Sequence, residues 1–124
     1  MTNSRILDNR APHVAFTGGI LNGSGSTLTI SGSTISGNGA SSPSQPDGGG
    51  LEADGTTTIT DTDITNNTVI GAEGSGAGIV QLSGTLSLTR VNVTGNLASG
   101  QYSFGGASTA PNSPSTHRTS TATK

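Results

Sequence analysis

Four charged side chains in the middle of the chain, Asp54, Asp61, Asp63 and Arg90, are the groups best suited to carry chemistry. Asp61 and Asp63 are separated by one residue, and Asp61 and Arg90 by 29 positions. Side chains two residues apart leave the same face of an extended chain, so these two aspartates, with Asp54 or Glu52 nearby, would suit Ca²⁺. Carboxylates without a defined binding loop are weak evidence for a metal site, so no cofactor is predicted and Ca²⁺ is kept only as the less favoured alternative. Asp61 and Arg90 are interpreted as an ion pair on the surface.

An asparagine that recurs every 29 residues is the most regular polar feature. These residues could present a polar array to a partner, but a structural role is favoured. Asparagine tolerates the left-handed turn conformation, and stacked side-chain amides can hydrogen-bond from one repeat to the next. The predicted ladder comprises Asn9, Asn38, Asn67 and Asn96.

Aliphatic residues form three repeated columns, the first two at the same 29-residue spacing, and predict the elements that hold these groups. The candidate core columns, one per strand, are Ile6, Ile35, Ile64 and Val93; Ile30, Ile59 and Leu88; and Ile20, Leu51 and Ile79.

Alternation with Thr, Ile and Val predicts strands, and no window has helical periodicity. Strands this short must stack on the next unit to bury a face. The chain is therefore predicted to be all-β, a right-handed parallel β-helix with about 3.5–4 coils of 29 residues and three short strands per coil. Glycine or alanine at Gly18, Gly49 and Ala77 would let the sheets approach closely.

The amino-acid composition narrows the classes of partner that the chain could bind. Only 28% of the residues are hydrophobic, which suits a thin solenoid better than a two-layer core, and the formal net charge of −2 provides no basic patch for nucleic acid. Membrane insertion is not expected, because no apolar run approaches the ~18 residues of a membrane helix. Cysteine is absent, and the first residues do not form a signal peptide.

Residues 1–107 are predicted to form the β-helix and residues 108–124, rich in Ser, Thr and Pro, a disordered tail. Tyr102 and Phe104 are expected to cap the apolar interior, and end-to-end self-association through open strand edges is considered. His13 and His117 have no carboxylate or hydroxyl at a repeat-defined neighbouring position that would indicate a catalytic triad, and both are expected to face solvent.

Three strings, Gly48–Leu51, Thr57–Thr60 and Asp63–Asn67, resemble the repeats of right-handed parallel β-helices in bacterial surface proteins. The resemblance is to the polymorphic outer-membrane protein and autotransporter-passenger type, and it covers Ser4 to Ala107. It implies an extracellular or cell-surface location, with glycans or host and cell-surface proteins as partners. The short length and the lack of a leader suggest a fragment of a larger exported protein.

The same resemblance implies two functions. The favoured one is a non-catalytic scaffold or adhesin-like module whose coils present Thr, Ser and Asn ladders to solvent. The alternative is a remnant or module of a pectin-lyase-like polysaccharide lyase or hydrolase, because such β-helices use carboxylates, often with Ca²⁺, and a basic residue. That alternative requires Asp54, Asp61, Asp63 and Arg90 to converge on one sheet face.

Overall fold

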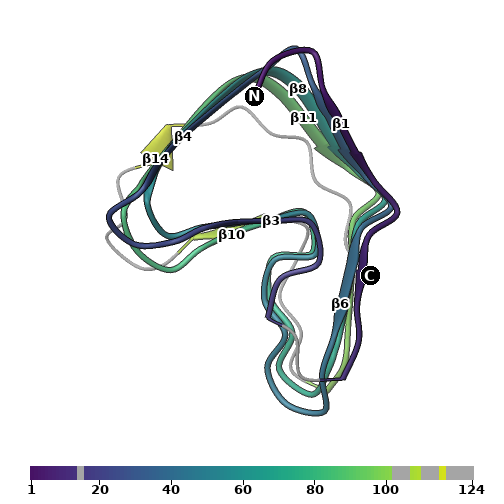
Figure 1. The fold of residues 1–124 in the computed structure, drawn as a ribbon. Coiled ribbons are helices and arrows are strands. Elements are labelled where there is room, and N and C mark those ends of the chain that lie inside the picture. Colours follow the sequence, from purple (N-terminus) through teal and green to yellow (C-terminus); the bar gives the residue numbers. More distant parts are fainter. Residues whose placement is uncertain (14–15, 102–106, 110–114, 117–124) are drawn as a thin grey trace.

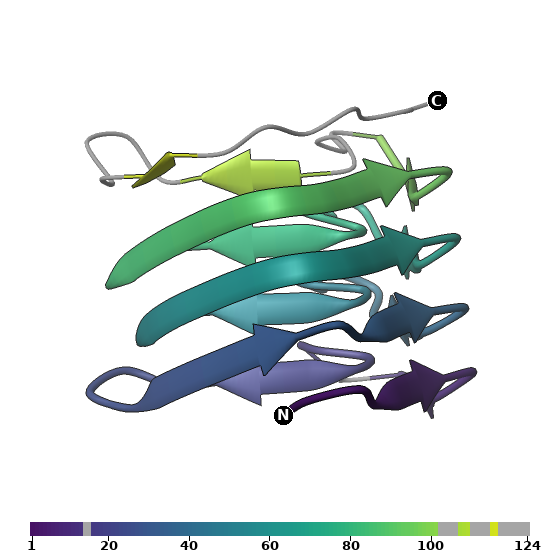
Figure 2. The ribbon, with the colours of Figure 1, turned by 90° about the horizontal axis from the view of Figure 1, so that it is seen from above.

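The protein is a parallel β-solenoid of about three turns (Figures 1 and 2). The computed structural model describes residues 1–13 and 16–101, and the backbone of 107–109 and 115–116. Within these residues there is no helix, and therefore none that could span a membrane. The all-β solenoid with its 29-residue spacing confirms the predicted fold class. The sequence count of 3.5–4 coils included incomplete coils at both ends.

Three parallel sheets form the sides of the solenoid, and Figure 1 looks along the stack, where successive coils nearly superpose. Sheet A contains β1 (Arg5–Leu7), β4 (Thr27–Ser31), β5 (Thr34–Ser36), β8 (Thr56–Thr65), β11 (Thr85–Thr94) and β14 (Ser115–Thr116). Sheet B contains β2 (Arg10–Ala11), β6 (Gly39–Ser41), β9 (Thr68–Ile70) and β12 (Leu97–Ser99). Sheet C contains β3 (Ile20–Asn22), β7 (Leu51–Ala53), β10 (Ile79–Gln81) and β13 (Ala107–Thr109).

The coils differ from the prediction in how strands are divided. The two segments expected as separate strands are continuous in β8 and β11, and sheet B, which follows each ladder asparagine, was not predicted as a strand. Its repeated segments are only two or three residues long, too short for period-two alternation to show in the sequence.

The main hydrophobic core lies between sheets A and C. Neighbouring coils place like residues over like, and Ile30, Ile59 and Leu88 are in register in sheet A, as are Ile35, Ile64 and Val93. All six side chains are buried, whereas Ile6 and Ile20 in the first coil are partly buried. Leu51 and Ile79 complete the core from sheet C. A smaller hydrophobic cluster of Val69, Ala77 and Ala98 is buried behind sheet B.

Left-handed residues bend each coil at two places. One column, at the middle of sheet A, contains Asn3, Gly32, Asp61 and Arg90, and a second, where sheet A meets sheet B, contains Asp8, Gly37, Asn66 and Gly95. The inserted residue at position 61 changes which residues face inward: Thr57 and Ile59 are buried before it, Thr62 and Ile64 after it. The strand therefore bends around the core while keeping an apolar face inside.

The stretch expected to be a tail contains two short strands. β13 pairs with β10 and β14 pairs with β11, both parallel, so the backbone continues two sheets beyond residue 107. Tyr102, Phe104, His117 and the other residues of this stretch lie outside the described part of the chain.

Candidate functional site

The asparagine ladder is an internal structure and not a solvent-facing array. Asn38, Asn67 and Asn96 are at most 2% exposed, and only Asn9, in the first coil, is exposed. The expectation that the ladder presents its amides to solvent is therefore wrong for three of its four members. The left-handed conformation also lies one residue earlier, at Asn66 and its equivalents.

Each interior amide bonds to both neighbouring coils. Asn67 donates from Nδ2 to Oδ1 of Asn96 at 2.9 Å and to the carbonyl oxygen of Ile35 at 3.0 Å. Its Oδ1 accepts from the backbone N–H of Asn38 at 2.9 Å and from Nδ2 of Asn38 at 3.1 Å. These bonds satisfy every donor and acceptor of a buried amide, which removes the cost of its burial.

The paired glycines of sheet C make room for the ladder. A Cβ on Gly50 would lie 2.9 Å from Nδ2 of Asn67, and one on Gly49 would lie 2.7 Å from the carbonyl oxygen of Thr68 in sheet B. Real Cβ atoms do not approach so closely. Glycine at both positions is therefore required by the close approach of the next coil, of sheet B and of the ladder asparagine.

Asp61 and Arg90 form an exposed, bidentate ion pair on sheet A. Nε of Arg90 is 2.5 Å from Oδ1 of Asp61, and Nη2 is 2.8 Å from Oδ2. The hydrogen bond and charge of Arg90 lower the pKa of the Asp61 carboxyl, and Asp61 raises the pKa of Arg90. With side chains 50% and 67% exposed, the pair joins two neighbouring coils without forming a cleft.

The remaining candidate carboxylates do not converge on this pair. Asp63 is exposed on β8, while Asp54 follows β7 and accepts from the backbone N–H of Leu82 at 3.1 Å. Glu52 lies on β7 of sheet C between the core residues Leu51 and Ala53, on a different sheet from Asp61. Within residues 1–13 and 16–101, no group of three or more histidine, aspartate or glutamate side chains is placed to hold a metal ion.

Glu52 is an unusual carboxylate because it is 8% exposed and stacked between two aliphatic residues. Its strand neighbours are Leu21 on one side and Val80 on the other. Desolvation raises the pKa of Glu52, a hydrogen bond from the Thr17 hydroxyl opposes the rise, and the nearby Asp54 and Asp47 add to it. This carboxyl influences stability, but its burial keeps it from solvent.

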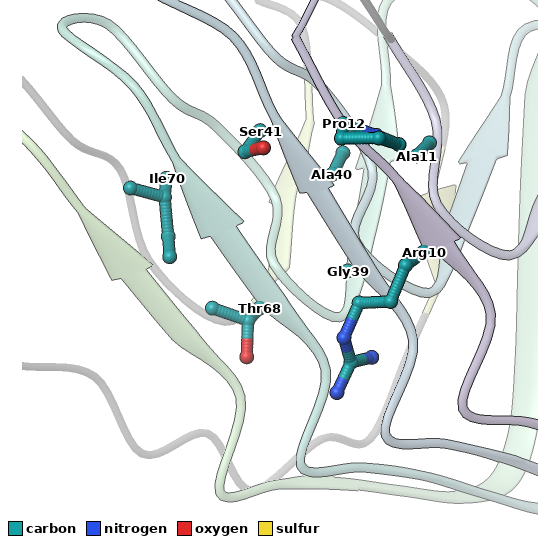
Figure 3. A pocket seen from close by; sticks show the side chains of 8 residues that line it. All are labelled: Arg10, Ala11, Pro12, Gly39, Ala40, Ser41, Thr68 and Ile70. Atoms are coloured by element: carbon teal, nitrogen blue, oxygen red, sulfur yellow. The ribbon is translucent and has the colours of Figure 1, made fainter.

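A pocket of about 300 Å³ opens on the outer face of sheet B (Figure 3). We call it the Arg10 pocket; Gly39 and Ala40 lie at its centre, and its rim includes Arg10, Pro12, Ser41, Thr68 and Ile70. Sequence reasoning missed this site. The equivalents of Arg10 in the next coils are Gly39, Thr68 and Leu97, so no repeated residue type marks the column.

Comparisons with protein-family models, with curated proteins and with solved structures found no match for this chain.

Proposed function

We propose that the chain is a non-catalytic β-helical scaffold that acts as a surface or adhesin-like module. Its setting would be extracellular or on a cell surface, as in the polymorphic outer-membrane protein and autotransporter-passenger type, and it would be part of a larger exported protein. The contact partners would be glycans, with host or cell-surface proteins as the other class.

The observation that carries this proposal is a grid of hydroxyl groups on the outer face of sheet A. The nine outward positions of three stacked strand segments all carry Thr or Ser, and none is buried. They are Thr27, Thr29, Ser31, Thr56, Thr58, Thr60, Thr85, Ser87 and Thr89.

This hydroxyl grid suits adhesion for two physical reasons. Neighbouring rows are spaced by the strand separation of about 4.8 Å, so the groups form a regular array of donors and acceptors. The backbone beneath them is held by parallel pairing on both sides in β8. A rigid array loses little conformational entropy when it binds a partner.

The scattered charged groups support a non-catalytic role. Glycoside cleavage needs an acid and a second carboxylate within roughly 5–10 Å on either side of one bond. Here Asp61 is paired with Arg90 on sheet A. Asp54 and Glu52 lie near each other at sheet C, but Glu52 is only 8% exposed, so these two carboxylates do not flank an open site. A module of a polysaccharide-active enzyme remains the alternative proposal, with Asp54, Asp61, Asp63 and Arg90 as its residues.

A glycan array probed with the purified full chain tests the proposal, with the retained glycans analysed afterwards for cleavage. We expect retention of intact glycans, and weaker retention by the Thr29→Val, Thr58→Val double variant, which keeps side-chain shape and strand propensity but removes two hydroxyls from the grid. The control is Thr94→Val, on the same sheet outside the grid. Released reducing ends or unsaturated products would instead establish the enzymatic alternative, and no retention would reject glycan adhesion.

A further inference from the structure

The Arg10 pocket combines a cation, hydroxyl groups and apolar side chains in a volume of about 300 Å³, which is near the lower limit of ligand pockets. Pro12 and the half-exposed Ile70 are apolar parts of its rim. Ser41 and Thr68 supply hydroxyls, each able to donate and to accept. No carboxylate lines the pocket.

Arg10 is held in place by the backbone of the coil corner. Its Nη1 donates to the carbonyl oxygen of Gly37 and, at 3.3 Å, to that of Asn9. These bonds use one nitrogen, and Nε and Nη2 have no hydrogen-bond partner among residues 1–13 and 16–101. In that part of the chain the ion pair of Arg90 with Asp61 is the only one, so the charge of Arg10 is not neutralised there.

Gly39 makes the hollow, and the fold does not require glycine at this position. A Cβ on Gly39 would lie 3.5 Å from Cδ of Arg10 and 3.6 Å from the carbonyl oxygen of Thr68, which are ordinary contacts. By contrast, Gly49 has no room for a Cβ. Gly39 therefore leaves a space between Arg10 and Thr68 that packing alone does not explain (Figure 3).

We propose that the Arg10 pocket binds one sugar ring that carries a carboxylate, an inference that rests on the proposed glycan-binding function. The free guanidinium nitrogens of Arg10 pair with the carboxylate, since arginine presents a planar fork of donors that matches it. Ser41 and Thr68 bond to ring hydroxyls, the hollow at Gly39 admits the ring, and the apolar side chains of Pro12 and Ile70 contact its C–H groups. A neutral sugar has no carboxylate to pair with Arg10.

The test is an NMR titration of the full chain with methyl β-D-glucuronide, beside methyl β-D-glucoside as the neutral sugar and acetate as the carboxylate alone. The amide shifts caused by the glucuronide are expected in β2, β6 and β9, with an affinity at least about tenfold above that of either comparison ligand. Equal affinity for the glucoside would overturn the role of the charge. Equal affinity for acetate would overturn the role of the ring.

Three variants sharpen the test. Arg10→Gln removes the cation, and Gly39→Val fills the hollow while keeping Arg10, so each is expected to weaken binding by about tenfold or more. Arg5→Gln makes the same charge change on sheet A and is expected to leave affinity within about twofold. Unchanged affinity in the first two variants would overturn the proposal. Glycan-array retention of neutral sugars without glucuronide binding would reject this inference and leave the adhesive function intact.

Discussion

Nδ2 of Asn38 donates to Oδ1 of Asn67 in the next coil at 3.1 Å, and the backbone N–H of Asn38 donates to the same oxygen at 2.9 Å. Asn67 repeats both contacts toward Asn96. One side-chain type thus ties successive corners together through buried bonds. Stability depends on this column because a missing member leaves donors and acceptors of two coils without partners.

Replacing one interior member of the ladder should destabilise the protein strongly. In Asn67→Ala the N–H and Nδ2 of Asn38 and the carbonyl of Ile35 lose buried partners, and we expect a loss of about 3–5 kcal/mol in the free energy of unfolding. Urea unfolding followed by circular dichroism measures it. The matched control is Asn92→Ala, an exposed position on β11. Similar losses in both variants would contradict the structural role of the ladder.

Glycine is required at position 49 because the backbones of two sheets meet there. In Gly49→Ala the new methyl group would lie 2.7 Å from the Thr68 carbonyl and closer still to that of Ala77, so we expect a fall of several degrees or more in Tm, or no folding. Thermal unfolding is the measurement. Gly23→Ala, where no heavy atom lies within 4 Å of the new Cβ, should remain near the wild-type Tm. A lower Tm for Gly23→Ala than for Gly49→Ala would contradict the close approach of sheets B and C at Gly49.

Burial of Glu52 predicts a defined pH dependence of stability. Its pKa is raised from 4.5 on folding, so the folded state binds the proton more tightly than the unfolded chain. The free energy of unfolding should therefore decrease as pH rises from about 4.5 through the raised pKa.

The variant Glu52→Gln keeps the hydrogen-bonding shape without the charge. It should be more stable than the wild type at neutral pH and should lack this part of the pH dependence, which denaturant midpoints between pH 4 and 8 would reveal. Asp63→Asn, an exposed carboxylate on β8, is the control. If the slope survives in Glu52→Gln, another group causes it.

The ion pair of Asp61 with Arg90 should be visible in the titration of the aspartate. Arg90 lowers the pKa of Asp61 from 3.8, so this group adds stability above its unfolded pKa, and that contribution is lost as pH falls through the folded pKa. In Arg90→Gln the NMR titration midpoint of Asp61 should rise toward the ordinary value, while Arg5→Gln should leave it unchanged. Because both side chains are exposed, added salt should reduce the shift in the pKa of Asp61. A titration midpoint that does not change with salt would argue against an exposed ion pair as its cause.

The solenoid could be predicted because its coils have equal length. Ile30, Ile59 and Leu88 are 29 residues apart and stand in register, so the stack follows from the spacing alone. The bend in sheet A could not be predicted in this way. Asn3, Gly32, Asp61 and Arg90 share one backbone conformation but no residue type: Asn, Gly and Asp favour a positive φ, whereas Arg does not.

The Arg10 pocket, unlike the solenoid, could not be predicted from the repeat. The 29-residue spacing points to Asp61 and Arg90, and in the structure these two residues form an exposed ion pair between neighbouring coils. The Arg10 pocket depends on a difference between coils, since a long side chain in β2 lies beside a glycine in β6. Such a site becomes visible only when the coils are stacked.

The bonds between ladder asparagines all run the same way, since Nδ2 of Asn9, Asn38 and Asn67 each donates to Oδ1 of the asparagine in the next coil toward the C-terminal end. Their dipoles add along the column, and each bond polarises the one that follows it. The ladder therefore gives the solenoid a direction, much as aligned peptide groups do for a helix. A duplicated coil would preserve this polarity only if it carried its own asparagine at the same corner. One residue per coil therefore decides whether an added repeat continues the ladder.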